Sequence, residues 1–174
     1  MHRLQVEASF LTHGSWPHLA SRFVRSLGSK PLSSAEEATV RNWLLGEEGA
    51  AFFDQPATDQ RHGYQSASHV AQHFPERRDL IRAALLHDLG KRHSQLNVIG
   101  RSLITGLAKV GLRRLFESKG GRADLYLRHG ELAADELSDL GTEPLVVAFA
   151  RSHHADRPIE IEASSWEILV AADR

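Results

Sequence analysis

Residues 83–91, Ala-Ala-Leu-Leu-His-Asp-Leu-Gly-Lys, constrain this chain most, because they join an apolar run directly to a histidine and an aspartate. We expect a buried helix over residues 79–89 whose last turn carries His87 and Asp88, with Gly90 as its C-cap. A neutral imidazole and an ionised carboxylate are both good ligands for first-row divalent metals. A buried helix end holds such side chains rigidly, so this segment predicts part of a metal site.

The length and composition favour one soluble domain. The chain has 174 residues, of which 41% are hydrophobic and 25% charged, as in an ordinary globular protein. A net charge of -1 argues against a nucleic-acid partner bound by bulk charge. No stretch approaches the roughly 20 apolar residues of a membrane span, and the start of the chain lacks the apolar core of a signal peptide. We therefore expect a cytoplasmic protein without a nucleic-acid or membrane partner.

The absence of cysteine limits the chemistry. It excludes thiolate zinc sites, disulfides and a cysteine nucleophile, so nitrogen and oxygen must hold any metal. The 11 histidines are the unusual feature of the composition.

Apolar residues recur at helical spacing along the chain, and no segment alternates with period 2 for long enough to indicate a strand. The predicted fold is therefore all-α. The predicted helices cover residues 17–27, 34–45, 47–53, 60–74, 79–89, 101–110, 123–140, 143–154 and 166–173, with a loop at 92–100. Short polar side chains mark the helix starts, namely Ser34 (in a capping box with Glu37), Asp59, Thr142 and Ser164 or Ser165.

We divide the chain into a helical extension at residues 1–56, packed on the core, and a metal-binding helical domain at residues 57–174. Within residues 103–116 a basic and apolar run admits two interpretations. It is either a helix that covers the rim of the site, which we prefer, or a helix that lies on a membrane surface.

Further residues of ligand type lie at helix ends or inside helices. His62 lies in the first turn of its predicted helix and shares a face with His69 and His73. The others are His129 in mid-helix, His153 and His154 at a helix end, and Asp173 after an apolar turn. A buried carboxylate is unfavourable unless it is paired or bound to a metal, so Asp173 is informative if its helix is in the core. Helices of a bundle can bring such turns together at one end.

The order His62, His87-Asp88 and Asp173, with Leu-Leu-His-Asp-Leu-Gly-Lys around the central pair, resembles the HD-domain superfamily of metal-dependent phosphohydrolases. The resemblance covers about residues 58 to 174 and implies an HD-type helical bundle. His62 fits the spacing of the first family ligand better than His69, which is the alternative. By resemblance to the two-metal branch, Asp88 would bridge two ions. His62, His87 and Asp173 would complete one site, and His129, His153 and His154 the other.

The resemblance also implies a reaction. Two divalent ions would activate a water molecule for attack on a phosphate, with Asp88, Lys91 and Arg61 as the predicted catalytic residues. The ligand types suit iron, manganese, cobalt, nickel or zinc. The implied substrate is a small phosphorylated molecule, and a nucleotide fits best. The sequence after His154 lacks the Gly-Tyr-Pro stretch of the cyclic di-GMP branch, which disfavours that substrate.

Three other interpretations stay open at this stage. One is a hydrolase with only the first metal. Another is a non-catalytic HD-type signalling or binding module with a structural metal, although such a descendant would be expected to have lost a ligand. The third is a helical partner-binding domain with incidental histidines. The sequence leaves the oligomeric state undetermined.

Overall fold

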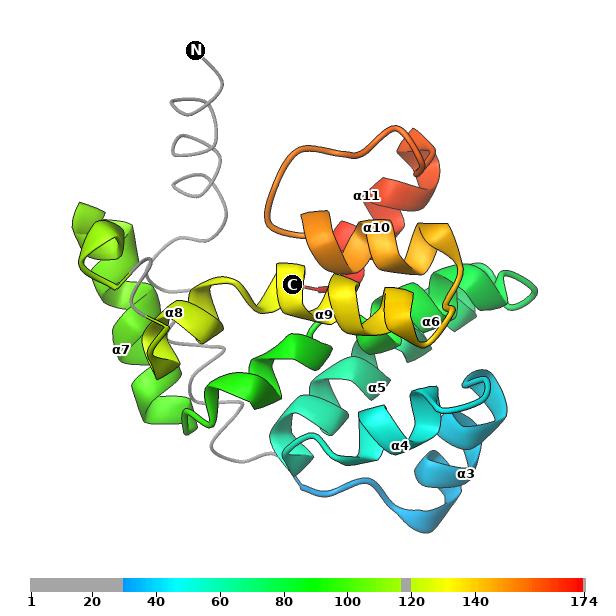
Figure 1. The fold of residues 1–174 in the computed structure, drawn as a ribbon. Coiled ribbons are helices and arrows are strands. Elements are labelled where there is room, and N and C mark those ends of the chain that lie inside the picture. Colours follow the sequence, from blue (N-terminus) through cyan, green and yellow to red (C-terminus); the bar gives the residue numbers. More distant parts are fainter. Residues whose placement is uncertain (1–29, 117–119, 174) are drawn as a thin grey trace.

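The computed structural model describes residues 30–116 and 120–173, and every regular element in these ranges is a helix (Figure 1). The predicted all-α fold is confirmed. The helix expected over residues 17–27 lies outside the described residues. In chain order the elements are α3 (Ser34–Trp43), α4 (Glu48–Phe53), α5 (Ala57–His73), α6 (Arg78–Leu86), the 3₁₀ helix η1 (Leu89–Ser94), α7 (Val98–Leu107), the π-helical η2 (Ala108–Leu112), the 3₁₀ helix η3 (Arg113–Leu115), α8 (Arg122–Leu127), α9 (His129–Asp139), α10 (Pro144–Ser152) and α11 (Ala163–Ala172).

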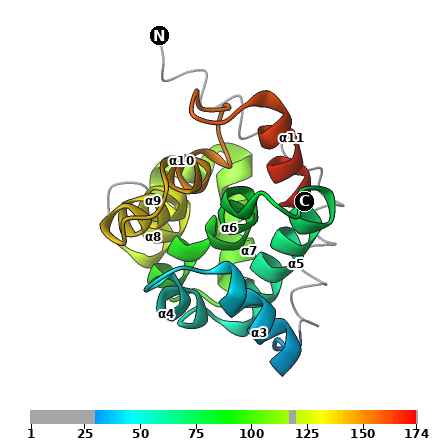
Figure 2. The ribbon, with the colours of Figure 1, turned by 90° about the vertical axis from the view of Figure 1, so that its right-hand side faces the viewer.

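Helix α6 forms the centre of the molecule. Every residue from 80 to 86 is buried, because other helices pack around it on all sides. Helices α5 and α11 lie on one side of α6, and α9 and α10 lie on the other (Figure 2). The apolar run that the sequence places before His87 is therefore the core helix, as expected.

The helices that precede α5 share this core. Val40 of α3 and Phe52 of α4 belong to the same buried cluster as the side chains of α6. Arg82 of α6 is buried and pairs with Glu48 of α4 and Glu143 before α10, which ties the three segments together. A buried ion pair of this kind is strongly destabilising to break, because it leaves an uncompensated charge.

Two helix ends differ from the sequence prediction near the central pair. Helix α6 stops at Leu86, and the chain continues past His87 and Asp88 into η1. Gly90 is therefore not a C-cap. Its backbone packs on α9, and a Cβ there would lie 2.1 Å from the carbonyl oxygen of His129. The glycine is needed for this close approach, since any side chain would collide with backbone.

The single helix predicted over residues 123–140 is two helices. The chain breaks at Arg128, where φ is -107° and ψ is 15°, so His129 begins α9 instead of lying in mid-helix. Gly141 follows the C-cap Leu140 of α9, with a φ of +71° that favours glycine.

Several predicted caps are displaced. Ser33 and Glu36 form the capping box of α3, one residue earlier than expected. The hydroxyl of Thr142 donates to Glu48 instead of capping α10, which begins with a proline in its first turn. Helix α5 begins at Ala57 and α11 at Ala163, so Asp59, Ser164 and Ser165 lie inside helices.

Helix α7 begins inside the predicted loop at residues 92–100 and is mostly exposed or half-buried. Of its ten residues only Ile104 is buried, and Ile99 and Leu103 are more than half exposed. The chain then passes through η2, where Gly111 has a φ of +85°. Among residues 30–116 and 120–173, no helix is long and apolar enough to span a membrane.

Candidate metal centre

Three helix ends or turns deliver four of the predicted ligands to one place. The end of α6 carries His87 and Asp88, the second turn of α5 carries His62, and Asp173 follows the last residue of α11. Since α5 and α11 both pack on α6, these side chains meet beside its C-terminus. We call His62, His87, Asp88 and Asp173 the first group; their ligand atoms all lie within 4.8 Å of one another.

In the first group two imidazoles face two carboxylates. Nε2 of His62 and Nε2 of His87 each lie 3.1 Å from Oδ1 of Asp173. The same nitrogens lie 3.5 and 3.4 Å from Oδ2 of Asp88. His87 is fully buried, whereas His62 keeps 27% of its side chain exposed and so marks the open side of the group.

The second group consists of three histidines, His129, His153 and His154, whose ligand atoms also lie within 4.8 Å of one another. His129 begins α9, His153 caps α10, and His154 follows it. Nε2 of His129 lies 3.2 Å from Nε2 of His153. The break at Arg128 makes this arrangement, because it turns α9 onto α10.

Hydrogen bonds to the backbone fix the ring orientation of three of these histidines. Nδ1 of His87, His129 and His153 lies 2.9, 2.7 and 2.8 Å from the carbonyl oxygen three residues earlier in each case. Because a carbonyl only accepts, each Nδ1 carries a proton, and each Nε2 is left to face the centre. Metal-bound histidines are held by the same kind of second hydrogen bond.

Asp88 lies between the two groups. Its Oδ2 faces the first group and pairs with Lys91. Its Oδ1 lies 3.4 Å from Nε2 of His129 and 3.6 Å from Nε2 of His153. This Oδ1 is buried and has no hydrogen-bond partner among the described residues. An unpartnered buried carboxylate oxygen beside two lone pairs is the environment that a bound cation would satisfy.

Electrostatics set the two carboxylates apart from ordinary buried acids. Burial disfavours the charge of Asp88, but Lys91 and His87 outweigh it and hold its pKa well below the usual value. Burial likewise opposes the charge of Asp173, and His87 and His62 keep its pKa well below the usual value. Both side chains are therefore ionised ligands near neutral pH.

The buried histidines respond to different neighbours. Burial opposes the charge of His87, but Asp88 and Asp173 outweigh it and raise its pKa. Burial, with His87 and His129 nearby, lowers the pKa of His153 to about 3. Burial and His153 lower the pKa of His154 well below its usual value. His153 and His154 are therefore kept neutral and can donate lone pairs.

A glycine beside a ligand lets the helices approach closely in each group. A Cβ at Gly63, next to His62, would lie 2.6 Å from the carbonyl oxygen of Leu85 on α6. A Cβ at Gly130, next to His129, would lie 2.8 Å from the carbonyl oxygen of Ala150 on α10. These contacts are shorter than real Cβ contacts, so the helix pairs that build the site depend on both glycines.

The structure does not bring Arg61 to the centre. Its guanidinium pairs with Glu36 at 2.6 Å and donates to the carbonyl oxygens of Lys30 and Pro31. These bonds tie α5 to α3, so the expected phosphate contact of Arg61 is corrected to a structural role. Lys91, by contrast, lies at the site beside Asp88.

The alternative ligand His69 lies outside both groups. Its ring packs against His73 at 4.7 Å between ring centres on the outer part of α5. Nε2 of His93 contacts the carboxylate of Glu136 at 3.0 Å, so this ring is not directed at either ligand group.

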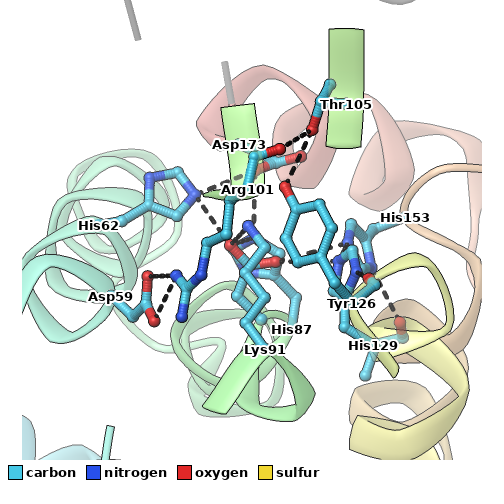
Figure 3. A network of polar contacts seen from close by, with 12 residues as sticks. Asp59, His62, His87, Lys91, Arg101, Thr105, Tyr126, His129, His153 and Asp173 are labelled. Carbon is cyan, nitrogen blue, oxygen red and sulfur yellow. Dashed lines mark hydrogen bonds and ion pairs between the residues drawn. The ribbon is translucent and has the colours of Figure 1, made fainter. Parts of the chain in front are cut away.

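Sequence reasoning missed four residues around the centre, namely Asp59, Arg101, Thr105 and Tyr126 (Figure 3). Nothing in their spacing sets them apart from helix surface residues. Asp59 resembled a cap, and only the packing of α7 reveals its partner, Arg101.

The chain matches no protein-family model, no curated protein and no solved structure. What the molecule presents is an all-helical domain with two His/Asp groups, buried at their centre, that could hold metal ions.

Proposed function

We propose that this protein is an HD-type, metal-dependent phosphohydrolase that cleaves a phosphate ester or anhydride of a small, nucleotide-type molecule. The observation that carries the proposal is the position of Asp88, whose two oxygens face two separate ligand groups. A carboxylate in this position can bridge two cations. The resemblance of the Leu-Leu-His-Asp-Leu-Gly-Lys segment to the HD superfamily supports the same assignment.

The donor sets fit divalent transition metals. The first group offers two imidazoles and two carboxylates, and the second group offers three imidazoles with Oδ1 of Asp88 beside them. Nitrogen and oxygen donors of this kind suit iron, manganese, cobalt, nickel or zinc. His62, His87, Asp88 and Asp173 would hold one ion, and His129, His153, His154 and Asp88 the other.

Bound ions would supply a water of lowered pKa and would polarise the phosphate. The chain itself supplies the surroundings of that reaction. Asp88 fixes the separation of the two groups, and the carbonyls of residues 84, 126 and 150 fix the rings of the buried histidines. Lys91 places a positive charge beside Asp88, where it would offset charge that builds on a phosphate.

Elemental analysis of protein purified without added metal, beside a phosphate-release screen over nucleotides and dinucleoside polyphosphates, tests the proposal. We expect about two transition-metal ions per chain and release from one substrate class, as in two-metal phosphatases. Protein that binds no metal and releases no phosphate after addition of manganese or iron would contradict the proposal. Metal without turnover would instead favour the non-catalytic module.

A further inference from the structure

Helix α7 is attached on both sides of the candidate metal centre. At one point Nη1 of Arg101 donates to both carboxylate oxygens of Asp59, at 2.6 and 2.7 Å. One turn further along α7, the hydroxyls of Thr105 and Tyr126 lie 3.1 Å apart. Figure 3 shows the two attachments, with Arg101 extending from α7 to Asp59 and Thr105 meeting Tyr126.

Each attachment point adjoins one ligand group. Asp59 precedes His62 by three residues on α5, so both lie on one helix face. Tyr126 holds His129 twice, because its carbonyl accepts from Nδ1 at 2.7 Å and its ring stacks on the imidazole at 5.7 Å between ring centres. The face of α7 that carries Arg101 and Thr105 therefore reaches from the first group to the second.

The pairing of Arg101 leaves part of its guanidinium unused. Asp59 takes both of its hydrogen bonds from Nη1 alone. Nε of Arg101 is buried and has no hydrogen-bond partner among the described residues. The side chains of Arg101 and Asp59 are only 11% and 10% exposed. A buried donor without a partner is costly, which indicates that it serves a ligand.

The unused edge of the guanidinium has the geometry that phosphate requires. A guanidinium binds two oxygens of a phosphate through two parallel N–H groups. In Arg61 the same groups are occupied, since Nε, Nη1 and Nη2 all donate to Glu36 or to backbone carbonyls. Arg101 thus has the free edge, beside the ligand group, that Arg61 lacks.

We propose that Arg101 binds a phosphate group of the substrate and that Asp59 is the positioning residue that orients its guanidinium. This inference rests on the proposed function, because it assigns a role within the same site. Arg101 lies beside the first group, so it would hold a phosphate whose cleavage takes place between the two groups.

The test is calorimetric titration of inorganic phosphate into manganese-loaded protein, with ion content measured on the same samples. Arg101→Gln should weaken phosphate binding about tenfold or more, as expected for the loss of charge-assisted hydrogen bonds, with an unchanged ion content. Arg77→Gln is the matched control. Arg77 forms a similar pair with Asp79, but at the start of α6, the end of that helix away from His87. It should bind phosphate as the wild type does.

A second variant separates ligand binding from structural pairing. Asp59→Asn keeps the guanidinium and one accepting oxygen but removes the carboxylate charge that orients it, so it should weaken phosphate binding less than Arg101→Gln does. If Asp59→Asn weakens phosphate binding as strongly as Arg101→Gln does, the pair is structural and the proposal is overturned. If Arg101→Gln does not fold, a loss of about tenfold or more in phosphate binding by folded Asp59→Asn overturns the proposal in the same way.

The outcomes also distinguish this proposal from the proposed function. Metal-dependent phosphate binding that is equal in the wild type and Arg101→Gln would overturn the role of Arg101 alone. Wild-type protein that binds neither manganese nor phosphate would overturn both.

Discussion

The two ligand groups differ in charge although they share Asp88. The first group contains two carboxylates, Asp88 and Asp173, whereas the second group consists of imidazoles only. A divalent ion in the first group would have two negative charges to offset its own. An ion in the second group would depend on Oδ1 of Asp88 for negative charge, and this oxygen lies 3.4 Å from Nε2 of His129. We infer that the first group binds its ion more tightly.

The groups also differ in what holds them together before an ion binds. The carboxylates of the first group raise the pKa of His87, and Nε2 of His87 and Nε2 of His62 each lie 3.1 Å from Oδ1 of Asp173. In the second group His153 has a pKa of about 3, and its Nε2 lies 3.2 Å from that of His129. The second group contains no carboxylate of its own that could hold these rings by charge. The second group therefore depends more on a bound cation for its geometry.

Asp88→Ala should have the largest effect, because it removes a ligand from both groups. We expect loss of both ions and a fall in turnover greater than the roughly 10–100-fold that follows the loss of an outer-shell partner. Elemental analysis and phosphate release measure the two effects. Asp135→Asn is the matched control, since Asp135 is an exposed carboxylate paired with Arg151. Full activity in Asp88→Ala would remove Asp88 from the mechanism.

Single-group variants should each remove about one ion per chain, as expected for a two-metal site. His129→Ala should empty the second group and leave the first. Asp173→Ala should empty the first group and leave the second. Since Asp88 remains, binding of the second ion should weaken less than binding of the first. His69→Ala is the control, because His69 packs on His73 outside both groups. An unchanged ion count in His129→Ala would favour a hydrolase with one metal.

Glycine variants should separate the groups through packing. Alanine gains up to about 1 kcal/mol of helix propensity over glycine. At Gly63 and Gly130 a clash with backbone should outweigh this gain and cost about 1–3 kcal/mol. Gly63→Ala should weaken binding of the ion in the first group, because it moves α5 away from α6. Gly130→Ala should weaken binding of the ion in the second group, because it moves α9 away from α10. Urea unfolding and ion content measure both effects.

The control for these variants is Gly106→Ala. Gly106 lies in α7, and a Cβ there meets nothing within 4 Å, so alanine should stabilise the protein slightly. If Gly63→Ala and Gly130→Ala were as stable as Gly106→Ala, the helices would be able to relax, and the close approach would not build the site.

Most of the candidate ligands were predictable because they follow or interrupt apolar helical turns, as His87, His153 and Asp173 do. The residues of both groups, from His62 to Asp173, lie together as the sequence pattern indicates. The break at Arg128 was not predictable, since the helical pattern of residues 123–140 continues through it. Gly90 was read as a cap because a glycine after a helix usually is one, whereas here the approach of α9 requires it.

The roles of the arginines could not be read from the sequence either. Arg61 precedes His62 directly, which suggested a role at the site, but neighbouring residues on a helix point in different directions. Its guanidinium turns to Glu36 on α3. Arg101 lies 42 residues after its partner Asp59, so only the three-dimensional structure reveals the pair. Long-range pairs of this kind leave no local signal.

The smallest expected effect is the loss of stability when the contact that holds the second group against Asp88 is broken. Glu136 of α9 accepts from Nη1 of Arg92 at 2.9 Å and contacts Nε2 of His93 at 3.0 Å, which docks η1 on α9. Burial opposes the charge of Glu136, but the hydrogen bonds from Arg92 and His93 outweigh it and lower its pKa. A lowered pKa means that the native state favours the ionised carboxylate, so the contact stabilises the fold above the ordinary pKa of glutamate.

Glu136→Gln should therefore lower the free energy of unfolding of the metal-free protein by about 1 kcal/mol at pH 7. The difference from the wild type should shrink as the pH falls below about 4, where the unfolded glutamate takes up its proton, and vanish below the native pKa. Urea unfolding at several pH values measures it. Glu131→Gln, which removes an exposed pair with Arg128, should change little. A difference that persisted in acid would show that shape, not charge, docks α9. The second group would then owe its position to packing at Gly90 and Gly130 alone.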